Sequence, residues 1–220
     1  MTPPGRRVDE GRVAELVTQA TDIVLAEGFA TFSMDALAAR LRCSKSTLYA
    51  AVGTKRDLVE SVVRRFFAAA TRRVEDVTAA EDDNRGKIKT YLYAVGAEMG
   101  RYSPAFYRDV VDYPPTAEIY RLNSDAAARR VREIIAAGVA AGQFRPVDAA
   151  FASELIVLAV DAVQRGQITE RTGLTASEGF AETANLLLDG LQYSSPVESS
   201  GPPASGTRGA RGGRRRVSES

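Results

Sequence analysis

The feature that most restricts the fold of this chain is the spacing of its apolar residues, which recurs at helical intervals through most of its length. In the segment 9–27, Val13, Leu16, Ala20 and Val24 fall on one face of a helix. Gly28 follows, and glycine readily takes the left-handed conformation that ends helices. No convincing stretch alternates with the period of a strand. The sequence therefore predicts an all-α fold.

The same spacing predicts eight further helices. They are expected after Ser33, after Ser44, from Thr54 to about Val77, and over 87–101, 104–111, 116 to about 141, 148 to about 164 and about 176–192. The pair Pro114 and Pro115 separates two of them, because proline ends helices and restricts the residue before it.

The predicted helices between residues 33 and 52 have the spacing of a helix-turn-helix motif. Ser33 is expected to cap the first of them. Only Arg42, Cys43 and Ser44 separate it from the second, in which Ser44 is the expected cap. Thr54-x-x-Asp57 resembles a capping box at the start of the next helix, with Asp in place of the usual Glu.

The stretch 44–55, SKSTLYAAVGTK, carries short hydroxyl side chains and lysines where a packing helix would show a solvated face of Glu and Lys. Such groups hydrogen-bond phosphates and base edges. A capped surface helix is the alternative interpretation, and Tyr49 could instead be a core tyrosine. Net charge is +1, with basic residues in slight excess before residue 67 and in the last segment, which weakly favours nucleic acid.

Composition argues against an enzyme. The chain has no histidine and one cysteine, and it shows neither a phosphate-binding glycine loop nor a metal-ligand cluster. We expect no metal site and no cofactor. Leu155–Val160, the longest uncharged apolar run, is too short to span a bilayer, so we expect no membrane association and a cytoplasmic location. A helical adaptor that binds proteins remains a competing function.

Residues 16–58 resemble the DNA-binding domain of the TetR (tetracycline repressor) family. The matching positions follow in order without gaps: Ala20, Gly28, Thr31, Ser33, Ala38, Ser44, Thr47, Leu48, Tyr49, Lys55 and Leu58. Downstream, Gly142-Gln143-Phe144-Arg145-Pro146-Val147-Asp148 is similar to the G-x-F-R-x-x-D joint common before the penultimate helix of that family.

The resemblance implies a homodimeric transcriptional regulator, expected to be a repressor, that binds a palindromic double-stranded DNA operator and responds to a small-molecule effector. We expect a flexible arm (1–8), a three-helix DNA-binding domain (9–53) and a ligand-binding and dimerisation domain (54–193). The Ser-, Gly-, Pro- and Arg-rich composition of residues 194–220 predicts a disordered basic tail. The expected DNA-binding residues are Ser33, Arg42, Ser44, Lys45, Ser46, Thr47, Tyr49 and Lys55.

The sequence departs from the family pattern at two places. Ala50, Ala51 and Val52 stand where aromatic and His residues usually follow the first Tyr. Arg42 replaces the turn glycine, so that it must adopt an unusual backbone conformation or shift the turn. Its charge could supply a substitute contact with a phosphate.

Two sets of residues in the C-terminal segment are expected to have further roles. Polar-tipped aromatic residues suit an effector cavity, although core packing is the alternative: Phe66, Tyr91, Met99, Tyr102, Phe106, Tyr107, Tyr113 and Tyr120. Surplus apolar residues on the last two long helices suit a twofold interface, although a monomer core is the alternative: Leu155, Leu158, Phe180, Leu187, Leu188 and Leu191. Cys43 is expected to be a small buried apolar residue rather than a redox group.

Overall fold

The computed structural model describes residues 10–192, and the expected arm (1–8) and tail (194–220) lie outside them. Within this range the chain forms helices and no strand, which confirms the all-α prediction. The helices are α1 (Glu10–Glu27), α2 (Met34–Arg40), α3 (Lys45–Val52), α4 (Lys55–Ala79), α5 (Asn84–Met99), α6 (Pro104–Asp112), α7 (Pro114–Ala140), α8 (Ala149–Gln164), α9 (Thr169–Thr172) and α10 (Ala176–Leu191).

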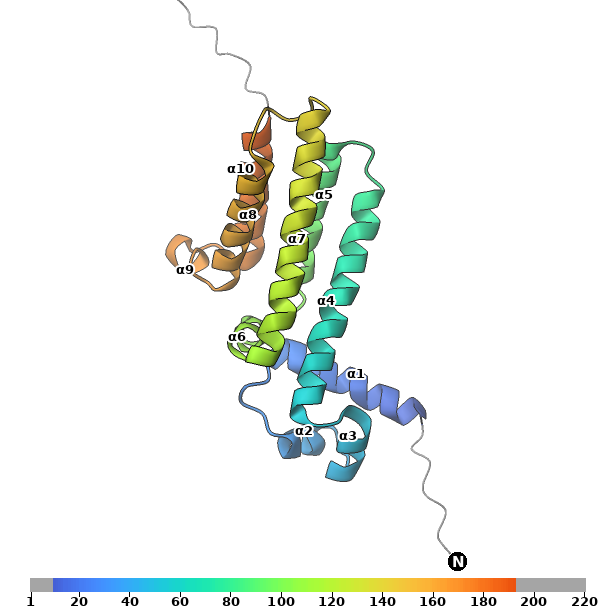
Figure 1. Cartoon of the computed structure of the whole chain (residues 1–220). Helices are drawn as coiled ribbons and strands as arrows, with labels where there is room; N and C mark the ends of the chain where they lie inside the picture. The colour runs from blue at the N-terminus through green and yellow to red at the C-terminus, as the bar shows by residue number, and fades with distance from the viewer. Residues whose placement is uncertain (1–9, 193–220) are drawn as a thin grey trace, which may run out of the picture.

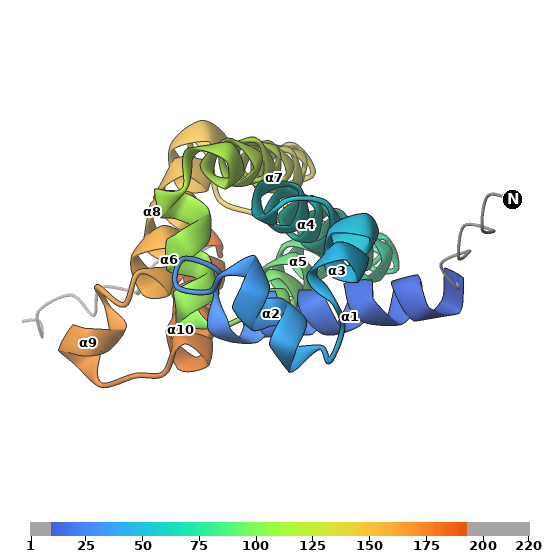
Figure 2. The ribbon, with the colours of Figure 1, turned by 90° about the horizontal axis from the view of Figure 1, so that it is seen from below.

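The helices form two parts, which we call the head (α1–α3) and the body (α4–α10). In the body, α4, α5 and α7 run side by side, and α8 and α10 pack together along one side (Figure 1). The head lies across the lower end of α4, and α6 lies where the head meets the body. Seen from below, the three head helices lie nearest the viewer, and α8 and α10 lie on the far side of the body from α4 (Figure 2).

Side-chain caps fix where the helices of the head begin. The Ser33 hydroxyl accepts a hydrogen bond from Ala36 N, and the Ser44 hydroxyl accepts one from Thr47 N, each at 3.1 Å. Thr54 and Asp57 form a reciprocal capping box at the start of α4. The three predicted helix starts are therefore confirmed, and residues 41–44 separate α2 from α3, one residue more than predicted.

Two helix starts differ from the prediction, and one short helix was not predicted. α5 begins at Asn84 rather than at Lys87, because the Asp83 side chain accepts a hydrogen bond from Gly86 N and caps the helix three residues earlier. α7 begins at Pro114 rather than at Thr116, since proline is well suited to the first turn of a helix. The short helix α9, which has no apolar periodicity of its own, was not predicted.

Two apolar cores hold the molecule together. The lower core joins all three head helices to α4, α6 and α7, through residues such as Leu16, Leu48, Val63 and Phe106. The upper core lies inside the body and includes Ile88, Ile135 and Phe144. Because the lower core crosses residue 53, the head shares its interior with the body.

The joint before α8 depends on close packing at a glycine. The ring of Phe144 lies against Gly138 of α7, and a Cβ atom at that glycine would collide with it. Arg145 then donates a backbone hydrogen bond to Leu191 O at 3.0 Å, which fixes the end of α10 beside the joint. This segment therefore sets the position of the last two long helices.

Candidate DNA-binding and ligand-binding sites

The turn of the helix-turn-helix motif contains a residue in an unusual backbone conformation. Arg42 is the non-glycine residue with positive φ among the described residues, at 51°. A left-handed conformation is costly for residues other than glycine. The sequence left two outcomes open, an unusual backbone conformation at Arg42 or a shifted turn, and the structure has the unusual backbone. Arg42 is an exposed residue in the turn that leads into α3.

The N-terminal end of α3 presents a group of polar side chains. Ser44, Lys45 and Ser46 are exposed, and the hydroxyl of Ser44 lies 2.9 Å from that of Ser46 and 2.8 Å from that of Thr47. Tyr49 is 46% exposed and is therefore not a core tyrosine. The buried Leu48 anchors the opposite side of the helix. The structure thus brings most of the predicted DNA-binding side chains together on one surface.

An ion pair holds the side chain of Lys45. Its ammonium group lies 2.5 Å from the Asp35 carboxylate at the start of α2. Both side chains are well exposed, and exposed pairs contribute little to stability. Lys45 can therefore exchange this partner for a phosphate at small cost.

Lys55 has a structural role that the sequence did not indicate. Its ammonium group donates hydrogen bonds to Phe32 O at 2.7 Å and Ala30 O at 3.2 Å, and it lies 4.9 Å from the centre of the Phe32 ring. These contacts fasten the loop between α1 and α2 to the start of α4. Contact of Lys55 with a DNA phosphate stays a prediction. DNA binding by Ser33, whose hydroxyl caps α2, also stays a prediction.

The same loop is also fastened to α6. The carboxylate of Asp109 accepts hydrogen bonds from Phe29 N and Ala30 N, the latter at 2.7 Å. Just before α6, Ser103 N also donates to Leu25 O in the last turn of α1, at 2.9 Å. The loop between α1 and α2 is therefore held from the body on two sides, by α4 and by α6.

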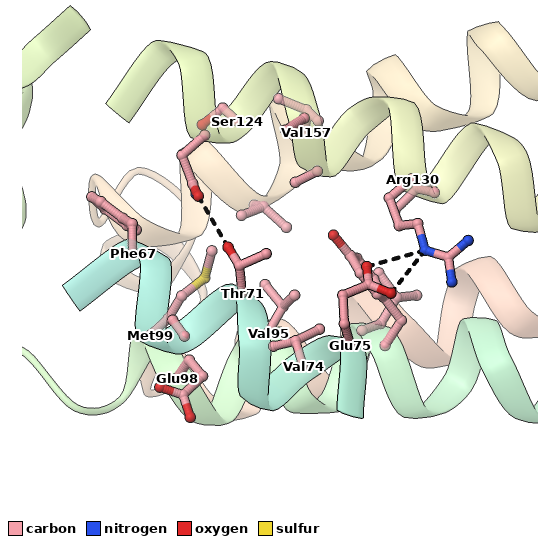
Figure 3. Close-up of a pocket in the computed structure, with 18 of the residues that line it drawn as sticks. Phe67, Thr71, Val74, Glu75, Val95, Glu98, Met99, Ser124, Arg130 and Val157 are labelled. Atoms are coloured by element: carbon pink, nitrogen blue, oxygen red, sulfur yellow. Dashed lines mark hydrogen bonds and ion pairs between the residues drawn. The ribbon is translucent and has the colours of Figure 1, made fainter. Parts of the chain in front are cut away.

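The body contains a cavity of about 360 Å³ between α4, α5, α7 and α8 (Figure 3). Its wall is mostly apolar and aromatic, as is usual for small-molecule sites, and its volume is within their range. Five of the predicted residues line it: Phe66, Tyr91, Met99, Tyr102 and Tyr120.

The predictions for Phe106, Tyr107 and Tyr113 are wrong, because these residues do not line the cavity. Phe106 is fully buried in the lower core. Tyr113 turns toward the head and packs edge-on against Phe29, with ring centres 6.0 Å apart. The Tyr107 hydroxyl donates to the Asp161 carboxylate at 2.6 Å and lies 3.2 Å from the Tyr120 hydroxyl. Phe106 and Tyr107 belong to α6, which is bonded through Asp109 to the loop between α1 and α2.

Two polar pairs cross the cavity wall between α4 and α7, and sequence reasoning missed both. The Arg130 guanidinium contacts the Glu75 carboxylate at 3.0 Å, and Thr71 contacts the Asn123 side chain at 3.4 Å (Figure 3). Thr71 and Glu75 are four residues apart, which places them on one face of α4. That spacing was the available signal, but it does not identify their partners.

Burial keeps the phenols of the cavity in their neutral form. Burial, together with the smaller effect of the nearby Glu75 carboxylate, raises the pKa of Tyr91 to about 12. Burial also raises the pKa of Tyr102, whose hydroxyl has no hydrogen-bond partner among the described residues. Although Tyr102 lines the cavity, its hydroxyl is covered by protein atoms.

A second apolar surface lies on the outside of the body. We call it the outer face, and it consists of Phe151, Leu155 and Leu158 on α8 and Leu186 on α10, which are 70%, 54%, 67% and 72% exposed. Phe151 and Leu186 were not predicted. Residues 151, 155 and 158 recur at helical spacing, so these three form one stripe.

The other predicted interface residues do not belong to the outer face. The prediction for Leu191 is wrong, because this residue is 2% exposed within the upper core. Leu187 and Leu188 pack partly against the same core. Phe180 faces inward, with its Cβ near Gly96 of α5. The prediction thus gave the outward side of α8, through Leu155 and Leu158, but not that of α10.

Two other kinds of feature were sought within residues 10–192. None of these helices is both long and apolar enough to cross a membrane. In the same range, no group of three or more His, Cys, Asp or Glu side chains is arranged to hold a metal ion.

Comparison with known proteins gives similarity in structure alone. No protein-family model matches the sequence, and no curated protein is significantly similar to it. Many solved structures of transcriptional regulators do match. A TetR-family regulator from Streptomyces coelicolor is 20% identical, with a TM-score of 0.68 over 84% of this chain and 98% of that one.

Two further structures extend this finding. A TetR/AcrR-family regulator from Thermobifida fusca is 22% identical, with a TM-score of 0.64 over 83% of this chain and 100% of that one. A regulator described as putative, from Saccharomonospora viridis in complex with choline, is 15% identical, with a TM-score of 0.69 over 81% and 96%. This chain therefore has the fold of the TetR-family transcriptional regulators.

Proposed function

We propose that this protein is a DNA-binding transcriptional regulator of the TetR family, which binds a palindromic operator as a homodimer and responds to a small molecule in the cavity. The observation that carries the proposal is the exposed polar end of α3, in a helix-turn-helix with the fold of such regulators. Helices of this kind place their N-terminal residues against base edges in the major groove.

Three groups at this end have distinct roles in the proposal. Ser46 and Tyr49 face outward from α3 toward base edges and the DNA backbone. Lys45 leaves Asp35 and pairs with a phosphate. Arg42 supplies a second cation from the turn. Contact of this guanidinium with DNA would explain why the position holds an arginine, although glycine would relieve the backbone strain.

The outer face supports the homodimer. Four large apolar side chains lie exposed across two adjacent helices, and a second copy would cover them with the same residues about a twofold axis. A dimer can present two α3 helices to half-sites one turn of DNA apart, about 34 to 36 Å. Palindromic recognition follows from that symmetry.

A chain of aromatic contacts connects the cavity with the head. Tyr102, which lines the cavity, packs against Phe106 with ring centres 5.3 Å apart. Phe106 in turn packs edge-on against Phe29 in the loop between α1 and α2, at 6.3 Å. A ligand that moves Tyr102 would thus move the loop that positions α2. It alters DNA binding only if it binds the two arrangements with different affinity.

Selection from a pool of random DNA duplexes, followed by footprinting, tests the proposal with the full-length protein. We expect a palindromic site. Lys45→Ala should bind it about tenfold more weakly and with a flatter salt dependence, because one ion contact is lost. Lys89→Ala, which removes an exposed lysine from α5, is the matched control and should bind as the wild type does.

A second variant separates DNA contact from folding. Arg42→Gly removes the guanidinium but suits the positive φ. We expect the thermal midpoint to rise while DNA binding weakens. Absence of any protected site at low ionic strength would overturn the proposed function.

A further inference from the structure

The helix-turn-helix motif carries a single negative charge among several positive ones. Asp35 is the one acidic residue between positions 33 and 53 of the sequence. The same stretch holds three basic residues, Arg40, Arg42 and Lys45. Basic side chains suit the phosphates of DNA, whereas a carboxylate on the same surface opposes them. The position and contacts of Asp35 therefore bear on how the motif recognises DNA.

Asp35 lies in the first turn of α2, beside the N-terminal end of α3. Its Oδ2 atom is 2.5 Å from Nζ of Lys45, the first residue of α3. Both helices lie at the end of the molecule that faces away from the body (Figure 1), and they are nearest the viewer when it is seen from below (Figure 2). The Asp35 side chain is 59% exposed. Its carboxylate thus belongs to the surface that is proposed to meet the major groove.

The fold of the head does not depend on a carboxylate at this position. The side chain that caps α2 is that of Ser33, not that of Asp35. Within residues 10–192, the ion pair with Lys45 is the one polar contact of the Asp35 side chain, and exposed pairs of this kind add little stability. An acidic residue in the first turn also suits the helix dipole, but this effect is modest at an exposed site. Stability alone therefore does not explain the acidic residue.

A carboxylate at a DNA interface is unfavourable unless a base offers it a hydrogen-bond donor. An ionised carboxylate accepts hydrogen bonds and donates none. In the major groove, guanine and thymine present acceptors but no donor, so a carboxylate facing them is repelled. Adenine presents the N6 amino group next to the acceptor N7, and cytosine presents the N4 amino group without an adjacent acceptor. Cytosine is therefore the base that matches a carboxylate best.

We propose, in an inference that rests on the proposed function, that Asp35 determines specificity by accepting a hydrogen bond from the N4 amino group of a cytosine in each half-site. Away from the operator, the carboxylate holds Lys45 and opposes the phosphates, which weakens binding to other sequences. On the operator, Lys45 moves to a phosphate and the cytosine amino group takes its place at Asp35. Neither charged group is then left without a partner, and this exchange requires cytosine at that position.

Selection from random duplexes by the full-length protein, followed by competition titrations on sites that differ at one base pair, tests this role. In the wild type we expect one position of each half-site to prefer cytosine about tenfold over guanine and thymine, and less strongly over adenine. Asp35→Asn should move the preference to adenine, because an amide donates to N7 and accepts from the N6 amino group. Asp35→Ala should bind all four bases at that position about equally.

Asp125→Asn is the matched control. Asp125 is an exposed carboxylate on α7 of the body, and it is paired with Arg121 at 2.8 Å. Its substitution changes the net charge by the same amount as Asp35→Asn, so it measures the general effect of charge on DNA binding. We expect this control to keep the base preferences of the wild type. All variants should melt close to the wild-type thermal midpoint, because both ion pairs are exposed.

The outcomes separate base recognition from a structural role and from the proposed function itself. If Asp35→Ala weakens binding equally at all sites and keeps every base preference, Asp35 only positions Lys45 and reads no base. If the wild type selects a palindromic site in which neither Asp35 variant changes a base preference, the inference about Asp35 alone fails. If the wild type selects no site at all, the proposed function fails, and the role of Asp35 fails with it.

Discussion

The cavity and the outer face are both apolar surfaces that the single chain leaves unfilled, yet they differ in shape and chemistry. The cavity lies between four helices, and aromatic and charged side chains share its wall with aliphatic ones. The outer face is exposed and carries one phenylalanine and three leucines without a polar atom. The first suits a small molecule, and the second suits a broad apolar surface such as its own copy.

One helix takes part in both surfaces. Ile156, Val157 and Val160 of α8 line the cavity, whereas Leu155 and Leu158 of the same helix point outward. A displacement of α8 therefore changes both surfaces at once. The following predictions test whether the two surfaces have the separate roles assigned to them.

The largest effect is expected from a charge on the outer face. Leu158→Glu would bury a carboxylate against the second copy, at a cost of about 3 kcal/mol or roughly a hundredfold in the dimer dissociation constant. Sedimentation velocity would show monomers. Val77→Glu changes a residue exposed on α4 and should leave the dimer intact. If Leu158→Glu remained dimeric, the outer face would not be the dimer interface.

An intermediate effect is expected from alkaline titration of the cavity. The folded-state pKa of Tyr91, about 12, lies above the value near 10 of an unfolded chain. Its contribution to stability is therefore complete below pH 10 and is lost as pH rises toward 12, because the unfolded state ionises first. Between pH 10 and pH 12, the free energy of unfolding measured by denaturant titration should fall by about 2 kcal/mol more for the wild type than for Tyr91→Phe. Parallel curves for the two proteins would contradict the assignment.

The smallest effect is expected where α6 contacts α8. Tyr107→Phe removes the hydrogen bond to Asp161. The ion pair between the Asp161 carboxylate and Arg165, at 2.8 Å, remains in the variant. We expect the free energy of unfolding in urea to fall by about 1 kcal/mol, which is typical of one hydrogen bond whose acceptor stays partly hydrated. A variant as stable as the wild type would show that this contact does not hold α8.

Local signals explain why the head was predicted in more detail than the body. Ser33, Ser44 and Thr54 bond to residues within their own first turns, so that sequence spacing alone reveals them. Arg42 was recognised as unusual because glycine was absent from a turn that favours it.

The errors in the body have a common cause in distant contacts. Phe106 and Tyr113 face the head because Asp109 binds the backbone of a loop about 80 residues away in sequence. Glu75 and Arg130 are 55 residues apart, and Thr71 and Asn123 are 52 apart. Periodicity shows which side of a helix is apolar, but it does not show which neighbour covers that side. For the same reason Leu191 was assigned outward although it is buried.

The shared lower core has a consequence for the integrity of the head. Leu16, Leu37 and Leu48 are enclosed partly by Val59 and Val63 of α4 and by Phe106 of α6, so that the three N-terminal helices have no separate interior. Severing the chain near residue 53 would expose these leucines to water. The surface proposed to read DNA and the body that contains the cavity are thus one cooperative folding unit, and neither can be exchanged as an independent module.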